Sequence, residues 1–313
     1  MSRLGKPEHL ALGVVAGALS AALFASALAD SGGLAAVFPV HFTSLPILFA
    51  SVSLGAAPFA AACATGVLGV AVGSGAGLYG GLIYMGIHLV PVSLLYLRLH
   101  FAKQSPDTPG FIGRLVCELT VLAAVALLIV LAGAAFDVSR LTEDIAVAFG
   151  KLLGAAAPDV PADAREAFVT ELVRYFPGFV AVWWLLSLVV CAVLAQAAAR
   201  RFGMARFPTP PYRAFEVPVW LVGLFLVTLL PAALLRGNVA SVAGSFALLF
   251  GTPLLLQGLA VIHTVSRSWP GRRLLLFACY GSLIWPFAPL AWALVTALGV
   301  IEHFGRFRRP HLV

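Results

Sequence analysis

Residues 31–97 read SGGLAAVFPV HFTSLPILFA SVSLGAAPFA AACATGVLGV AVGSGAGLYG GLIYMGIHLV PVSLLYL. This stretch lies between Asp30 and Arg98 and contains no Asp, Glu, Lys or Arg. A transmembrane helix needs about 20 consecutive apolar residues, so the stretch has room for about three crossings. Proline and the Gly/Ser-rich residues 74–77 divide it into expected helices of about 40–55, 57–74 and 78–98, of which the first is short. The chain is therefore a polytopic membrane protein.

Other charge-free runs of similar length support this conclusion: 9–29, 119–136, 175–199, 217–235, 237–266 and 274–301. Hydrophobic residues make up 61% of the chain, charged residues only 11%, and the mean hydropathy is +1.00. Soluble domains carry about 25% charged residues. We expect an all-α fold, a transmembrane helical bundle of about eight to ten membrane segments, with residues 1–313 forming one integral membrane domain in the lipid bilayer.

The net charge of +7 does not indicate nucleic acid as a partner, because the positive residues flank the apolar runs. Such strips anchor helices at the membrane surface, as we expect for Arg200, Arg201, Arg206 and Arg213. The cysteines lie far apart inside apolar runs, so neither a disulfide nor a metal site is expected at Cys63, Cys117, Cys191 and Cys279.

The first apolar run, residues 10–29, predicts helix 1, although Ala27-Leu28-Ala29 also resembles a signal-peptide cleavage site. Its length of a full membrane span favours a retained helix. Small residues recur at every fourth position and form a stripe suited to close helix packing: Gly13, Gly17, Ala21 and Ala25. The stripe could pack inside the chain or dock another membrane protein. A second small-residue ladder includes Gly69 and Gly73.

Lys and Arg in short loops predict the orientation, because positive side chains stay cytoplasmic. Arg3 and Lys6 place the N-terminus inside, and Arg98, Lys103 and Arg114 lie inside after four crossings. Segment 137–177 then lies outside; its part 137–174 holds seven acidic against four basic residues. Two amphipathic helices are expected in it, either as an interfacial hairpin or as a cap over a cavity. This topology indicates a protein of the bacterial inner membrane.

The final run, 274–301, allows two arrangements. One long helix would place the basic tail outside, whereas a hairpin broken near Pro286 keeps both of its ends inside, with arms of about 13 to 15 residues. We favour the hairpin, which makes both termini cytoplasmic.

Polar side chains inside the apolar runs are the candidate ligand-binding residues: His88, Glu118 and Gln257. A polar group in hydrocarbon is tolerated where protein or water satisfies it, so these side chains should face the bundle interior. They could converge on one cavity, or each could form a hydrogen bond between helices. Glu302 and His303 are expected at the solvated interface.

Enzymatic signatures are missing from the sequence. There is no GxxxxGK[ST], HExxH or GxSxG motif, and the aspartates stand in loops rather than in pairs on helices. We therefore expect a non-enzymatic protein without a cofactor, which cannot energise transport by itself.

The C-terminal half carries a family resemblance. Asn238, the stretch Leu255-Leu256-Gln257-Gly258-Leu259-Ala260-Val261-Ile262-His263, and Phe304-Gly305-Arg306-Phe307-Arg308-Arg309 after a further apolar run resemble the YybS-like family of uncharacterised bacterial multipass membrane proteins. That family is distantly similar to the S components of energy-coupling factor vitamin transporters. The resemblance implies a membrane module that binds a small ligand or another envelope protein. Segment 137–177 and the additional C-terminal helices exceed a compact six-helix S component.

Two functions follow as hypotheses. The first is a small-molecule binding or transport module that works with an ATPase encoded elsewhere, and the second is a scaffold of the cell envelope linked to division, shape or wall assembly. A binding module should enclose a polar-lined cavity near the membrane midplane, whereas a scaffold should be packed solid.

Overall fold

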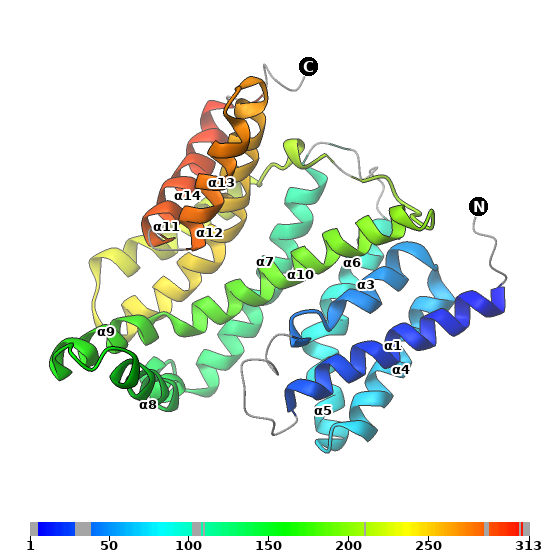
Figure 1. Cartoon of the computed structure of the whole chain (residues 1–313), viewed down its shortest axis with the longest axis horizontal. Coiled ribbons are helices and arrows are strands. Elements are labelled where there is room, and N and C mark those ends of the chain that lie inside the picture. The colour runs from blue at the N-terminus through cyan, green and yellow to red at the C-terminus, as the bar shows by residue number, and fades with distance from the viewer. Residues whose placement is uncertain are drawn as a thin grey trace. The chain divides into compact units, whose positions relative to one another are not determined.

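Every regular element in the described part of the chain is a helix (Figure 1). The computed structural model describes residues 6–28, 39–101, 108, 110–209, 211–284, 288–306 and 308. Within these ranges, seven helices are long and apolar enough to cross a membrane: Pro7–Ser26, Ala56–Gly73, Gly77–Phe101, Phe111–Gly133, Phe176–Arg201, Gly237–Ser268 and Ala288–Gly305. Two shorter apolar helices are Ser44–Ser53 and Val219–Leu234. The predicted polytopic helical bundle is confirmed.

The chain forms two compact units. Unit 1 comprises residues 1–108 and 184–210, and unit 2 comprises residues 109–183 and 211–313. Unit 1 contains α1 (Lys6–Leu28), α3 (Ser44–Ser53), α4 (Ala56–Gly73), α5 (Gly77–Tyr84), the π-helical turn η1 (Met85–Leu89) and α6 (Val90–Phe101). Helix α10 (Phe176–Arg201) contributes its C-terminal part to unit 1 and its N-terminal part to unit 2.

Helices α1 and α4 of unit 1 pack through the small-residue stripe. A Cβ atom on Gly13 would collide with the Pro58 carbonyl, and one on Gly17 with the carbonyl of Ala62. Farther along, a Cβ on Gly69 would lie 2.8 Å from that of Ala21. Because residue numbers rise together along both helices, α1 and α4 run parallel. The stripe of Gly13 and Gly17 is thus covered by α4 of the same chain.

Helix α3 is too short to cross a bilayer alone. Its ten residues rise about 15 Å, half of a hydrocarbon core of about 30 Å, and nearly all of them are buried. Its N-terminal end meets Ser20 of α1, whereas Ala50 and Leu54 pack with Ala16 nearer the start of α1. Helix α3 therefore runs antiparallel to α1, which allows the next helix, α4, to run parallel to α1.

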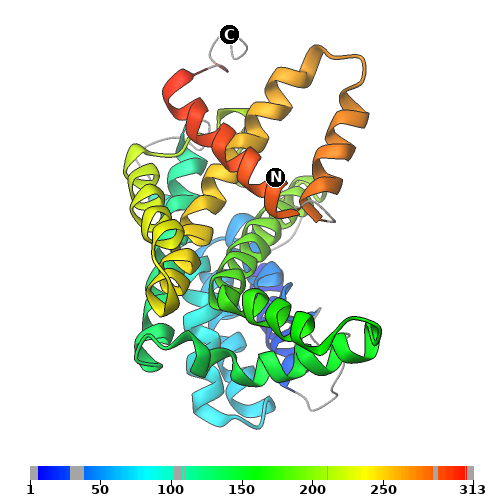
Figure 2. The same ribbon diagram turned by 90° about the vertical axis from the view of Figure 1, so that its left-hand side faces the viewer.

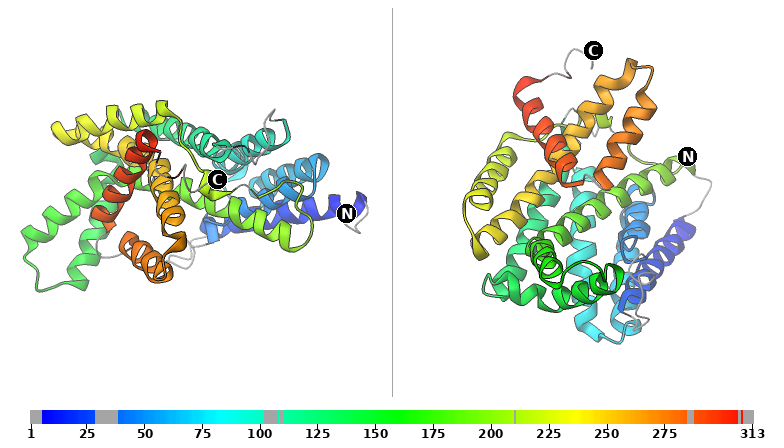
Figure 3. Two further views of the ribbon diagram at one scale, coloured as in Figure 1. Left: turned by 90° about the horizontal axis from the view of Figure 1, so that it is seen from above. Right: turned by 60° about the vertical axis from the view of Figure 1, so that its left-hand side comes forward.

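Unit 2 is built around α12 (Gly237–Val265), its longest helix. The unit also contains α7 (Phe111–Gly133), α11 (Val219–Leu234), α13 (Arg272–Ile284), α14 (Ala288–Gly305) and the short 3-10 turns η2 (Tyr212–Ala214) and η3 (Ser266–Ser268). Helices α12 and α14 cross in close contact (Figures 2 and 3): a Cβ on Gly258 would collide with the Val295 carbonyl, and one on Gly299 with the Leu254 carbonyl. Glycine is required at this crossing because the backbones touch.

The two predicted amphipathic helices are present in unit 2. Helix α8 (Val138–Ala156) begins at Asp137, whose carboxylate accepts a hydrogen bond from the Ser139 backbone N–H, and α9 (Ala162–Arg174) packs beside α8 (Figure 1). Asp137 also accepts a hydrogen bond from Asn238 at the start of α12, at 3.4 Å. This contact places the α7–α8 turn and the α11–α12 turn at the same end of unit 2.

The last apolar run forms two helices, α13 and α14, as predicted, and not one long helix. Pro286, where the break was expected, lies outside the described residues, as do Arg3, Ala29, Asp30 and Lys103. Helix α13 has 13 residues, whereas α14 has 18 and is therefore longer than expected for a hairpin arm.

Candidate functional site

The interior of unit 1 contains a polar cluster formed by Ser20, Thr43, Ser44, Tyr84 and His88, which we call the hydroxyl–histidine cluster. All five residues are buried; Tyr84 and Ser20 are 0% exposed and His88 is 7% exposed. Helix α1 supplies the first residue, the start of α3 the next two, and α5 with its π-helical extension the last two. Three separate segments therefore bring polar groups to one place.

The hydrogen bonds in the cluster can be given directions. Ser20 Oγ lies 2.5 Å from the Thr43 carbonyl, which can only accept, so the single serine proton goes there. Tyr84 Oη, 2.7 Å from Ser20 Oγ, must then be the donor to Ser20. Ser44 Oγ lies 2.9 Å from His88 Nδ1, and the donor of this bond depends on the histidine tautomer. The cluster therefore contains two hydrogen-bonded pairs of side chains, Tyr84 with Ser20 and Ser44 with His88.

Aromatic and glycine contacts fix the two rings. Phe24 of α1 meets Tyr84 edge-on at a centroid distance of 5.3 Å and His88 at 5.5 Å. On the other side, a Cβ on Gly66 of α4 would lie 2.5 Å from Tyr84 Oη. Glycine at this position leaves the space in which the tyrosine hydroxyl sits.

The π-helical turn that carries His88 has a cause in the sequence. Pro91 has no backbone N–H, so it cannot form the helical bond to the Ile87 carbonyl four residues earlier. The indole Nε1 of Trp184, on α10, donates to that carbonyl at 3.2 Å. A π-turn inserts one extra residue into a helix and is frequent at functional sites. Tyr84 and His88, four positions apart, both lie in the cluster.

The C-terminal part of α10 also holds the segment before α3. Ser187 Oγ lies 3.4 Å from His41 Nδ1, and the Cys191 thiol donates to the His41 carbonyl at 3.2 Å. Residues 41–44 thus lie between α10 on one side and the cluster residues of α1 and α5 on the other.

Gln257 in unit 2 is arranged differently, because its side chain forms hydrogen bonds to backbone groups. Gln257 of α12 is 0% exposed; its Oε1 accepts from the Val217 N–H at 2.6 Å and its Nε2 donates to the Gly299 carbonyl at 2.8 Å. Close to Val217, a Cβ on Gly113 of α7 would collide with the Glu216 carbonyl. Gln257 therefore binds the segment before α11 to α12 and α14.

A buried ion pair closes the same end of unit 2. Arg308 Nε donates to Glu302 Oε1 at 2.9 Å, and both side chains are 5% exposed. The guanidinium also donates to the Arg213 carbonyl at 2.8 Å and to the Phe215 carbonyl at 2.9 Å. The expectation of a solvated Glu302 was wrong, because the chain turns back at Arg306, with φ +50°, and returns Arg308 to the carboxylate.

Comparison with known protein families gives one match. The family described as "Predicted membrane protein (DUF2232)" matches residues 18–302. The chain belongs to this family. The curated proteins and the solved structures gave no match. The match covers both units of this DUF2232 protein, including the cluster of unit 1 and the polar contacts of unit 2.

The predicted ligand-binding residues of this DUF2232 protein are divided between its units. His88 lies in unit 1, whereas Glu118, half-buried on α7, and Gln257 lie in unit 2. His88 and Gln257 face the interior of their units. The convergence of all three on one cavity stays a prediction. Among the helix-packing residues, Gly13, Gly17, Ala21 and Gly69 lie in the α1–α4 contact, while a Cβ on Gly73 would meet nothing within 4 Å.

Sequence reasoning missed the partners of His88 in the cluster: Ser20, Thr43, Ser44 and Tyr84. A signal was available for one of them, since Tyr84 stands four residues before His88 and so shares its helix face. The serines gave no signal, because hydroxyls in apolar helices usually bond to their own helix. In the described ranges, no group of three His, Cys, Asp or Glu side chains could hold a metal ion.

Proposed function

We propose that this DUF2232 protein is a non-enzymatic membrane module that binds a small molecule through the hydroxyl–histidine cluster, in the manner of a transporter S component. One observation carries the proposal. Seven buried hydroxyls elsewhere in the described residues bond to a carbonyl three or four residues earlier in their own helix: Ser51, Ser53, Thr120, Thr142, Ser245, Thr252 and Thr264. Ser20 and Ser44 instead bond to groups 23 to 64 residues away.

Hydrogen bonds between side chains of separate segments can be exchanged for bonds to a ligand without opening a helix. Tyr84 donates, Ser20 both donates and accepts, and the imidazole of His88 can do either. Such a set suits a small molecule that carries both hydroxyl or carbonyl and amine or amide groups. An ionisable residue inside a membrane segment, such as His88, is a functional-site hypothesis by default, because it costs energy unless it has a partner.

The second candidate is a scaffold of the cell envelope. The close packing of unit 2 favours it, since glycine contacts and backbone-directed polar groups hold α7, α12 and α14 together. A scaffold predicts that the cluster is one more structural contact, and that its loss lowers the amount of folded protein.

We propose an inner-membrane location with both termini cytoplasmic. The basic residues Arg213, Arg267 and Arg308 stand beyond helix ends opposite to the end that carries Asp137 and the acidic helices α8 and α9, which fits the rule that positive loops stay inside. Fusions of alkaline phosphatase and of a fluorescent protein after Ala155 and after Val313 test this. Phosphatase activity after Ala155 alone is expected, and phosphatase activity after Val313 would reverse the proposal for the C-terminus.

A partner is part of the proposal, since the sequence contains no nucleotide-binding motif that could energise transport. An ATPase unit encoded elsewhere would supply that step. Docking through α1 would use its exposed apolar residues, such as Val15 and Leu19, because α4 covers the glycine stripe.

The test of binding is native mass spectrometry of the protein purified in mild detergent. The wild type is expected to retain a small molecule, and the His88→Ala variant is expected to lose it at an equal yield of folded protein. An equal amount of bound molecule in both proteins would contradict the assignment of the site. A wild type without bound small molecule when isolated from cells would favour the scaffold.

A further inference from the structure

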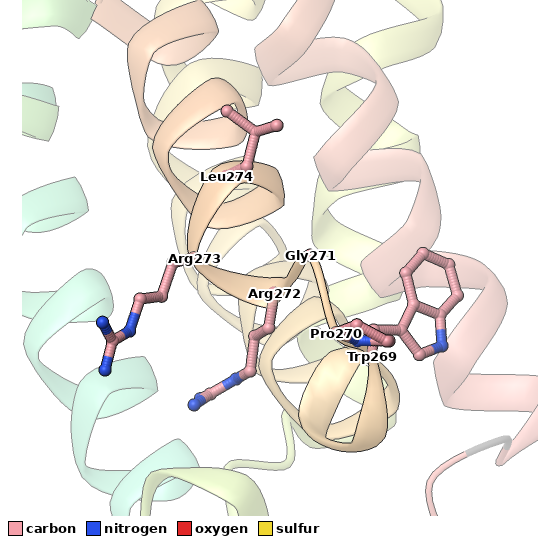
Figure 4. A pocket seen from close by; sticks show the side chains of 6 residues that line it. All are labelled: Trp269, Pro270, Gly271, Arg272, Arg273 and Leu274. Atoms are coloured by element: carbon pink, nitrogen blue, oxygen red, sulfur yellow. The ribbon is translucent and has the colours of Figure 1, made fainter.

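The turn between α12 and α13 forms a positively charged hollow. Its lining residues are consecutive in the sequence, and Figure 4 shows them: Trp269, Pro270, Gly271, Arg272, Arg273 and Leu274. The hollow has a volume of about 500 Å³ and is open to the outside of the unit. The side chains of Arg272 and Arg273 point to the same side of the turn, away from Trp269.

The arginine charges have no local counter-charge in the sequence. Residues 217–301 include Arg236, Arg267, Arg272 and Arg273 but no Asp or Glu. In addition, the Nε atom of Arg272 is buried and has no hydrogen-bond acceptor among the residues that the structure describes. The turn therefore carries positive charge without an acidic side chain anywhere in residues 217–301.

The position of the turn indicates the kind of anion. Trp269 is 54% exposed and directly follows a helix that is long and apolar enough to span the membrane, Gly237–Ser268. Tryptophan is enriched at the level of lipid headgroups, so the hollow lies at the membrane surface. Basic pockets beside membrane helices bind the headgroups of anionic lipids.

The adjoining helix offers a surface for acyl chains. None of the residues of α13 is buried, and its 13 residues rise about 20 Å, which is less than the hydrocarbon core of about 30 Å. An exposed stripe starts at the hollow and continues along the helix: Leu274, Phe277, Gly281 and Ile284. The small Gly281 leaves a shallow place between the larger side chains of this stripe.

We propose that this hollow is a binding site for an anionic phospholipid. The phosphate accepts hydrogen bonds from Arg272 and Arg273, and an acyl chain follows the exposed stripe of α13. Two cationic side chains attract the negative phosphodiester, whereas a zwitterionic lipid presents its own ammonium group to the arginines. This site is independent of the hydroxyl–histidine cluster, which belongs to unit 1.

The experiment is a lipid titration followed by native mass spectrometry of the full chain in detergent, with phosphatidylglycerol and phosphatidylcholine as probes. Because each cation near an anionic lipid contributes about a five-fold change in affinity, the double variant Arg272→Gln/Arg273→Gln should bind phosphatidylglycerol about thirty-fold more weakly. The matched control is Arg200→Gln/Arg201→Gln, which removes an exposed pair at the end of α10. The control should bind like the wild type.

Two further experiments determine whether the bound phosphate belongs to a lipid or to a soluble molecule, and where on the chain the lipid binds. Soluble glycerol 3-phosphate should not displace the lipid, and a diazirine-labelled phosphatidylglycerol should label the tryptic peptide that begins at Leu274, even if the double variant fails to fold. Equal binding of the two lipids by the wild type, equal losses in both double variants, displacement by glycerol 3-phosphate, or labelling elsewhere would each overturn the proposal.

Discussion

The two units differ in the partners of their central buried polar side chains. In unit 1, Ser20 meets Tyr84 and Ser44 meets His88, so side chains from separate segments bond to one another. In unit 2, Gln257 and Arg308 bond to backbone N–H and carbonyl groups near η2 and α14. Backbone partners cannot be given up without loosening the chain, whereas side-chain partners can rotate away. The hydroxyl–histidine cluster of unit 1 can therefore exchange its partners for a ligand, whereas the contacts of Gln257 and Arg308 in unit 2 hold the structure together.

The buried ion pair of Glu302 and Arg308 in unit 2 should give the largest effect on stability. Glu302→Ala leaves Arg308 buried without its carboxylate, and the loss of one member of a buried ion pair costs about 3–5 kcal/mol. We expect a large fall in the free energy of unfolding, measured by denaturant titration in detergent. Glu171→Ala, which removes the exposed carboxylate partner of the half-buried Arg174, should change it by less than about 1 kcal/mol. Similar effects of the two substitutions would contradict a special stabilising role of the buried Glu302–Arg308 pair.

The glycine contacts of unit 1 should give the next effect. Gly17→Leu places a side chain against the Ala62 backbone, and such overpacking costs about 1–3 kcal/mol, so the yield of folded protein and its melting temperature should fall. Gly73→Leu is the matched control, since a Cβ there meets nothing within 4 Å. Wild-type behaviour of both variants would mean that α1 and α4 do not pack as described.

Tyrosine hydroxyls allow a direct comparison of the units. Tyr84→Phe removes a donor to Ser20, and Tyr212→Phe removes a donor to the Leu256 carbonyl at 2.7 Å. Each change should cost about 1 kcal/mol of stability, the usual net value of one hydrogen bond. Only Tyr84→Phe should weaken retention of the small molecule in native mass spectrometry. A loss of the molecule in the Tyr212→Phe variant would break the assignment of binding to unit 1.

The smallest effect is expected at Asp137, the exposed residue that caps α8. Hydrogen bonds from Ser139 hold the pKa of its carboxyl below the usual value. A lowered folded pKa stabilises the protein above the unfolded value of about 3.9, and this contribution is lost as the pH falls through the folded pKa. The melting temperature of the wild type should exceed that of Asp137→Ala at about pH 6, and the difference should shrink at about pH 2. The same difference in melting temperature at both pH values would contradict a stabilising role of the ionised Asp137 carboxylate.

Hydropathy was sufficient to predict the fold class, because a charge-free run of membrane length has few alternatives in lipid. The spacing of Gly13 and Gly17 likewise indicated a packing face, and the structure places α4 on it. Of the cluster, the sequence indicated only His88 as a candidate. Its serines lie in the same kind of sequence as Ser51, which bonds to its own helix, and only the tertiary arrangement separates the two cases.

The ion pair of Glu302 could not be predicted from helical spacing. Its partner lies six residues later, beyond the end of α14, and reaches the carboxylate only because Arg306 adopts a left-handed backbone conformation. Gln257 was correctly recognised as a buried polar residue. That its partners are the backbone groups of Val217 and Gly299 follows from contacts between distant segments, which periodicity does not report.

Native mass spectrometry of four variants, together with their folded yield, gives the amount of bound small molecule per folded protein. The variants are Tyr84→Phe and His88→Ala in unit 1, and Gln257→Ala and Glu302→Ala in unit 2. We expect that the unit 1 variants keep their yield and lose the molecule, while the unit 2 variants lose yield and keep the molecule on each folded copy. A loss of yield without loss of the molecule in both unit 1 variants would contradict it.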